Sequence, residues 1–127
     1  MQALQSVMAP GLPAPAGHYS HAQVYGGVAY LAGQLPAVPG QPGAKPGSIE
    51  EQTRQVLANV EQVLHACGTT KERVLRCTVY VADISHWPAV NRVYAEFFGA
   101  HRPARCVVPV KELHHGYAIE VEATAAI

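Results

Sequence analysis

The feature that most limits how this chain folds is a stretch of prolines and glycines in its first half. Residues 33–47 hold four prolines and four glycines. Proline removes a backbone N–H and glycine loses much conformational freedom when ordered, so this stretch can sustain neither a helix nor a central strand. We therefore expect a long surface loop, with the regular elements before and after it.

The part before the loop is predicted to contain one hairpin. Residues 1–17 are small, proline-rich and aperiodic, which indicates an extended lead-in rather than a packed element. Val24–Tyr25 and Val28–Leu31 are typical of two strands. The Gly26-Gly27 pair between them supplies the positive φ angles that a two-residue hairpin turn needs.

The part after the loop begins with a helix signal. Ser48 and Glu51 form a capping box, and Gly68 supplies a C-terminal stop. Between them, side chains for one buried face recur at spacings of three and four: Ile49, Thr53, Val56, Val60, Val63 and Cys67. We predict an amphipathic helix of about five turns.

Four further elements follow this helix. Residues 74–81 are expected to form a buried strand, and Ser85 with Pro88 is expected to open a second helix that ends before Gly99. Residues 105–110 and 118–126 are expected to be strands. In the last strand, apolar residues alternate with Glu120, Glu122 and Thr124.

The predicted order is β-β-α-β-α-β-β, an α+β fold with one mixed sheet and both helices on one face. A length of 127 residues fits one domain, spanning 1–127. Apolar residues make up 49% of the chain and charged residues only 14%, which is rich for a small monomer. We therefore predict that the helix-free face packs against copies of the same chain.

Charge and cysteine content restrict the partners and the compartment. Nine basic and nine acidic residues cancel, so we expect neither a nucleic acid nor a membrane as a partner. The three cysteines form no C-x-x-C pair, which favours a reducing compartment. No leader pattern or apolar run of ~18 residues is seen, so we expect a cytoplasmic protein.

Several short patterns together resemble the YjgF/RidA family over roughly residues 17 to 127. They are Gly17-His18-Tyr19, Ala32-Gly33-Gln34, Gln55 to Val60, Thr78 to Asp83, Val90-Asn91 through Phe98, Pro103-Ala104-Arg105, and Ile119 to Ala123. The resemblance implies a chorismate-mutase-like fold, a homotrimer and three clefts between subunits. Active members of the family hydrolyse 2-imino or 2-enamino acids to 2-oxo acids and ammonia, with no metal or organic cofactor. Other members lack the key arginine and this activity.

Two residues are expected to carry the chemistry. By the resemblance, Arg105 binds the substrate carboxylate, and a planar guanidinium suits that task because it can form two parallel hydrogen bonds. Glu120 matches the family glutamate that positions water and transfers protons. Without the resemblance, Arg105 is better explained as a surface arginine paired with a glutamate, and Glu120 as the polar half of an alternating strand.

Four further residues are expected to line the cleft. Tyr19 resembles the aromatic residue beside the substrate's planar atoms, and Gly33 lets a carboxylate approach the backbone. Asn91 matches a cleft residue that orients the ligand, with a polar residue on an exposed helix face as the alternative. Val107 replaces a frequent family cysteine, and its backbone carbonyl remains available to hold water.

Other departures from the family pattern concern the pocket. Ala32 replaces a usual Ser or Thr, which removes a hydroxyl worth about 1 kcal/mol to a bound carboxylate. His114 replaces a usual proline and precedes His115, while His18 replaces another, so we expect a reshaped pocket.

The sequence also leaves other interpretations open. His18, His21, His114 and His115 lack the spacing of a metal site and are expected to be solvated. Cys77 and Cys106 are expected to be buried small residues rather than nucleophiles. The deaminase competes with a non-catalytic trimer that binds small carboxylates and with a ribonuclease or translation inhibitor, which the charge balance disfavours.

Overall fold

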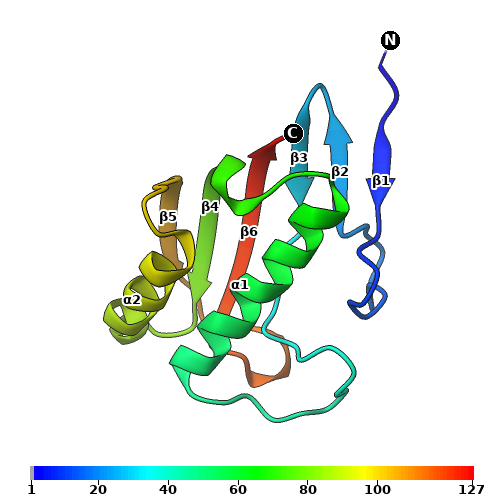
Figure 1. Cartoon of the computed structure of the whole chain (residues 1–127). Coiled ribbons are helices and arrows are strands. Elements are labelled where there is room, and N and C mark those ends of the chain that lie inside the picture. Colours follow the sequence, from blue (N-terminus) through cyan, green and yellow to red (C-terminus); the bar gives the residue numbers. More distant parts are fainter. Residues whose placement is uncertain (1) are drawn as a thin grey trace.

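Residues 2–127 are described by a computed structural model, in which a six-stranded sheet carries two helices (Figure 1). The strands are β1 (Gln5–Val7), β2 (Ala22–Tyr25), β3 (Val28–Leu31), β4 (Val74–Val81), β5 (Ala104–Pro109) and β6 (Ile119–Ala126). The helices are α1 (Ile49–Ala66) and α2 (Trp87–Phe98), and short 3-10 turns cover Lys71–Arg73, Ile84–His86 and His114–Gly116. Within the described chain, neither helix combines the length and apolar character needed to cross a membrane.

The sheet is mixed, as predicted. Its strand order is β1-β2-β3-β6-β4-β5, in which β4 and β5 pair in parallel and all other neighbours are antiparallel. The hairpin is confirmed, since Gly26 and Gly27 both have positive φ angles between β2 and β3. The last strand, β6, lies inside the sheet between β3 and β4.

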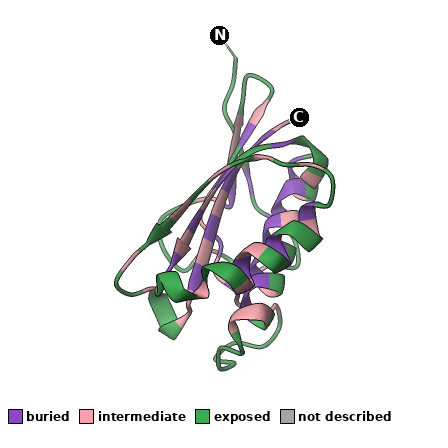
Figure 2. Ribbon diagram, turned by 90° about the vertical axis from the view of Figure 1, so that its left-hand side faces the viewer, coloured by how far each residue is buried: buried purple, intermediate pink, exposed green. Residues whose placement is uncertain are grey.

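Both helices cover one face of the sheet and leave the other face open (Figure 2). β6 shows the division most clearly, because Ile119, Val121, Ala123 and Ala125 are buried while the residues between them are partly exposed. Side chains alternate between the two faces of a strand, so Glu120 and Glu122 leave β6 on the helix-free face. The prediction of helices on one side is therefore confirmed.

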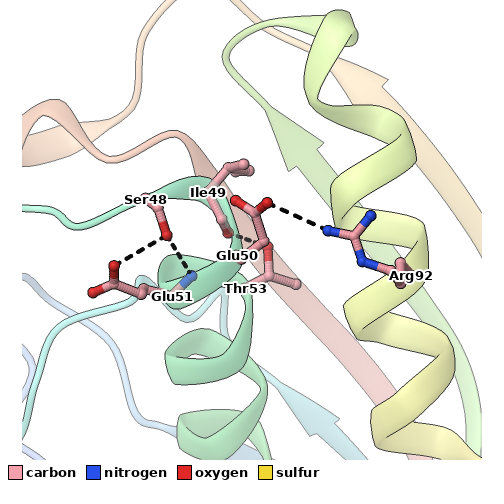
Figure 3. Close-up of polar contacts among 6 residues, drawn as sticks. All are labelled: Ser48, Ile49, Glu50, Glu51, Thr53 and Arg92. Atoms are coloured by element: carbon pink, nitrogen blue, oxygen red, sulfur yellow. Dashed lines mark hydrogen bonds and ion pairs between the residues drawn. The ribbon is translucent and has the colours of Figure 1, made fainter.

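The start of α1 follows its predicted cap. Ser48 accepts a hydrogen bond from the backbone N–H of Glu51 at 3.1 Å, and its hydroxyl donates to the Glu51 carboxylate at 3.2 Å (Figure 3). Thr53, on the buried face of α1, donates to the carbonyl of Ile49 at 2.7 Å. Glu50 forms an ion pair with Arg92 of α2 at 3.3 Å, which links the two helices at their surface.

The second helix begins at Trp87, two residues after its predicted start at Ser85. Asp83 caps the short turn that precedes this helix, because its carboxylate accepts the backbone N–H of Ser85 at 2.8 Å. A 3-10 turn over Ile84–His86 follows, and the α-helix begins only at Trp87, with Pro88 in its first turn. Proline is tolerated there because the first helical N–H groups have no partner within the helix.

The expectation that residues 1–17 form no packed element was also wrong. Gln5–Val7 forms strand β1, which pairs with β2, and Val7 and Ala9 belong to the core. The strand is too short and too polar to show an alternating pattern by itself. It forms because β2 offers it a free edge.

His21 attaches this N-terminal arm, although we expected it to be solvated. It is buried, and its Nδ1 accepts the backbone N–H of Ala9 at 2.8 Å while Nε2 lies 3.1 Å from the carbonyl oxygen of Pro13. Because Nδ1 is the acceptor of a backbone N–H, the proton sits on Nε2, which donates to Pro13. One neutral imidazole thus holds two points of the arm.

Replacing His21 by Ala is expected to loosen the arm selectively. The buried N–H of Ala9 would lose its acceptor, which costs about 2 kcal/mol of local opening free energy. Hydrogen exchange should therefore speed up over residues 5–13 and not in α1. Gln62→Ala is the matched control, because Gln62 also binds the arm, at the carbonyl of Pro10, but through an exposed hydrogen bond. Equal effects of the two changes would contradict the role assigned to His21.

Candidate functional site

An open pocket of about 1180 Å³ lies beside the start of β6. Its walls come from the N-terminal arm, from the loop between Ala32 and Pro46, and from the turn at His114–Tyr117. In Figure 1 this loop and the segment that precedes β6 meet at the lower end of the sheet. Three of the predicted site residues line the pocket together: Tyr19, Gly33 and Glu120.

Glu120 contributes a carboxylate to this pocket from the start of β6. Burial raises the pKa of its carboxyl above the ordinary value; the nearby His114 opposes this shift and the charge of Glu122 adds to it. A carboxylate with a raised pKa binds a proton more readily than a solvated glutamate does. Glu122 has another task, since its carboxylate accepts the Tyr80 hydroxyl at 2.8 Å.

Gly33 makes room for this carboxylate. A Cβ atom built on Gly33 would lie 2.6 Å from Oε2 of Glu120, closer than atoms can approach without displacement. The absence of a side chain therefore lets the Glu120 carboxylate lie against the loop backbone. The sequence predicted that a carboxylate can approach the backbone at Gly33. In the structure, the carboxylate that does so is that of Glu120 in the same chain.

The rim of the pocket carries aromatic and imidazole rings. Tyr19 is 50% exposed, so its ring is open to a ligand. On the other side, the ring of His115 lies 5.8 Å from that of His114 and 6.2 Å from that of Tyr117. His115 has a φ of 62°, the one positive φ among the non-glycine residues that the structure describes. The departures at His114 and His115 thus alter the surroundings of Glu120.

Two polar residues on the buried face of α1 hold the walls of the pocket, and sequence reasoning missed them. The Asn59 amide donates to the carbonyls of Leu35 and Ala37 at 2.9 and 2.8 Å. Gln52 donates to the carbonyl of Gly47 and accepts the backbone N–H of Ala118, both at 2.8 Å. The signal in the sequence was an amide side chain at a helix position that periodicity assigns to the core.

Arg105 lies at a second location, under α2. Its Nη1 donates to Oδ1 of Asn91 at 3.0 Å, and its guanidinium carbon lies 4.8 Å from the centre of the Tyr94 ring. Over residues 2–127, no carboxylate lies within ion-pair distance of Arg105. The simplest alternative for this residue, a surface arginine paired with a glutamate of its own chain, therefore does not describe it.

A single chain does not bring Arg105 and Glu120 together. Arg105 pairs in register with Cys77, which is buried under the helices, whereas Glu120 pairs with Tyr80 on the open face. Ala123 is also opposite Cys77, so the two site residues are three positions apart along the strand direction, or about 10 Å, and two strands apart. They point to opposite faces of the sheet.

Val107 lies two residues after Arg105, on the same face of β5, and packs against the core. β5 is the last strand of the sheet, so no strand among the described residues pairs with the backbone groups on its outer edge. Cys106 points the other way and is exposed, with its Sγ 3.4 Å from Nη2 of Arg76. Its predicted burial was wrong because no helix covers that face, whereas Cys77 is buried as predicted.

No cluster of three or more potential metal ligands occurs in the part of the chain that the structure describes. Asn91 contacts Arg105 rather than lining the pocket of Glu120.

Comparison with known proteins places these features in context. The profile of the family described as "Endoribonuclease L-PSP" matches residues 11–127. A 2-iminobutanoate/2-iminopropanoate deaminase of the goat, Capra hircus, is 37% identical over 113 residues, which cover 89% of this chain and 82% of the goat protein. Among solved structures, the yeast protein YEO7 superposes with a TM-score of 0.93 at 38% identity over 98% of both chains. TdcF of E. coli with bound serine gives a TM-score of 0.90 at 28% identity over 97% of this chain and 98% of TdcF.

Substituting Gly33 by Ala is expected to displace the Glu120 carboxylate without unfolding the protein. The clash involves the end of a flexible side chain, so that side chain moves rather than the backbone. We expect a melting temperature near that of the wild type and a measurable change in the Glu120 pKa, followed by NMR of the side-chain carboxyl. Gly17→Ala is the control, because its Cβ would meet Tyr19 at an ordinary contact distance of 3.5 Å. An unchanged Glu120 titration in Gly33→Ala would refute the contact.

Proposed function

Because this chain belongs to the endoribonuclease L-PSP family, also known as RidA or YjgF, we propose that it is a hydrolytic deaminase of 2-imino and 2-enamino acids. The products are 2-oxo acids and ammonia. The observation that carries the proposal is a guanidinium with no carboxylate partner among residues 2–127 of its own chain, in the same fold as a pocket that holds Glu120. The goat relative bears the name of this activity.

The active site is proposed to form between two copies of the chain within a homotrimer. Arg105 and Glu120 lie on opposite faces of one sheet, so the guanidinium of one copy must meet the carboxylate of the next. The open face also exposes large apolar groups, with Tyr30 at 52% and Leu75 at 50%, which packing against a neighbour would cover. The free outer edge of β5 gives Arg105 and Val107 access to such a neighbour.

In this site Arg105 binds the substrate carboxylate. A 2-imino acid carries that group next to the electrophilic C=N carbon, so fixing the carboxylate also fixes the carbon to be attacked. The planar guanidinium can donate two parallel hydrogen bonds, which set the orientation as well as the position. The bound serine of TdcF supports a small amino-acid-derived ligand with the same carboxylate.

Glu120 transfers the protons. Its carboxylate takes a proton from water as the water oxygen bonds to the imine carbon and the C=N electrons move to nitrogen. The nitrogen takes up two protons, the one that Glu120 returns and the one that the new hydroxyl loses, and the C–N bond breaks as that hydroxyl becomes a carbonyl. One water is consumed for each ammonia released, and the steps require no cofactor.

The remaining predicted residues assist. Tyr19 lines the pocket with its exposed ring against the planar substrate, and Gly33 leaves the Glu120 carboxylate free to approach. The backbone carbonyl of Val107 is proposed to hold the attacking water. Ala32 supplies no hydroxyl, so substrate affinity depends more heavily on Arg105.

The proposal is tested with 2-imino acids generated in situ by an amino-acid oxidase, over a panel that includes 2-iminopropanoate and 2-iminobutanoate. We expect Arg105→Lys and Arg105→Ala to lower kcat/KM by at least about 100-fold, because lysine keeps the charge but loses the planar fork. Glu120→Gln should remove turnover and keep binding of the 2-oxo acid product. Absence of acceleration by the wild type over the panel would falsify the proposal, and product binding without turnover would indicate a carboxylate-binding protein instead.

The acid limb of the pH profile provides a second test. Glu120 must be ionised to act as a base, so kcat/KM should fall as the pH drops through its raised pKa. His114→Asn removes a group that lowers this pKa, so the limb should move to higher pH. Glu122→Gln removes a charge that raises it, so the limb should move to lower pH while the Tyr80 hydroxyl keeps its acceptor. Shifts in the same direction would contradict Glu120 as the base.

A further inference from the structure

We infer that Asn91 and Tyr94 of α2 are positioning residues that hold the Arg105 guanidinium oriented without neutralising it. The inference rests on the proposed function, in which Arg105 binds a carboxylate that comes from outside its own chain. It changes the sequence-based role of Asn91, which was contact with the ligand, into contact with the residue that binds the ligand.

Asn91 provides a neutral acceptor. The Asn91 Oδ1 takes one of the five N–H groups of Arg105, at 3.0 Å, and leaves the other four for other partners. A carboxylate at this place would fix the arginine as well, but it would also cancel the charge and compete with the substrate. An amide fixes one end of the guanidinium and retains the full positive charge.

Tyr94 provides a flat surface beneath the guanidinium. The Arg105 Cζ lies 4.8 Å from the Tyr94 ring centre, within the range of a cation–π contact. The ring is 7% exposed and packs on Phe98 at a centroid distance of 4.7 Å, so it cannot swing away. Contact with a fixed ring on one side restricts the positions that the guanidinium can take.

The ring of Tyr94, and not its hydroxyl, makes this contact. The hydroxyl is buried beside the Cys77 thiol, and within residues 2–127 it forms no hydrogen bond with Arg105. A hydroxyl that does not contact the guanidinium adds nothing to the binding of Arg105. The ring of Tyr94 contacts Arg105 and the hydroxyl does not, so a Tyr94→Phe variant removes the hydroxyl and keeps the contact.

The two residues act from one rigid element. Asn91 and Tyr94 are three positions apart, so they project from the same side of α2. The helix itself is fixed by the buried side chains of Val90, Val93 and Phe98. Arg105 lies on the edge strand β5, where no further strand confines it, so its orientation depends on α2.

The decisive variant is Asn91→Asp. It places a carboxylate within hydrogen-bond distance of the guanidinium, so an internal ion pair would compete with the substrate. We expect KM for the imine and Kd for pyruvate, a 2-oxo acid probe, to rise at least about tenfold, with kcat changed much less and the melting temperature kept. Asn91→Gln, which keeps an amide, is expected to recover part of the loss. Wild-type affinity for pyruvate in Asn91→Asp would overturn the inference.

Tyr94 is tested by a matched pair. Tyr94→Phe keeps the ring and should leave Kd for pyruvate within about twofold of the wild type, whereas Tyr94→Leu should weaken it by about fivefold or more. Equal losses in the two variants, or none in either, would overturn the role of the ring. If Tyr94→Leu does not fold, the Kd values of Tyr94→Phe and Asn91→Asp for pyruvate still test the inference. Pyruvate binding without imine hydrolysis by the wild type would refute the deaminase and leave this inference testable by Kd; an absence of binding would refute both.

Discussion

The whole arrangement depends on a sheet that is covered on one face only. Strand β6 lies inside this sheet, and its alternation commits every second residue to the core beneath α1 and α2. The residues between them, which include Glu120, must therefore point to the open face. Because Arg105 leaves the neighbouring part of the sheet on the covered side, the same alternation that builds the core also separates the two residues proposed to carry the chemistry. A catalytic site that contains both requires a second copy of the chain.

Elements with a strong local period were predictable from the sequence. The cap at Ser48, the buried face of α1, the hairpin at Gly26-Gly27 and strand β4 all have local causes, and all are present. The misses have nonlocal causes. β1 exists because β2 offers an edge, and His21 is buried because an arm eight to twelve residues earlier in the chain supplies its partners. A tertiary contact of this kind leaves no periodic signal in the chain.

Three residues of the candidate pocket were predictable from the sequence, and the layout of the predicted site was not. The family resemblance pointed to Arg105 and Glu120, and the pocket does gather Tyr19, Gly33 and Glu120. The contact between Asn91 and Arg105 could not be predicted from the sequence, because it depends on how helix α2 packs beside strand β5. Asn59 was equally hidden, since an amide on a buried helix face looks like an exception to the pattern until its acceptors are known.

The way in which Asn59 holds the long loop has a consequence for how the protein can diversify. Its amide grips the carbonyl oxygens of Leu35 and Ala37, which are main-chain atoms that every amino acid possesses. These hydrogen bonds therefore do not depend on which side chains Leu35 and Ala37 carry. Side chains at Leu35 and Ala37 can therefore change without loss of these two hydrogen bonds. In β6, by contrast, every second side chain is buried in the core, so a substitution there changes the packing.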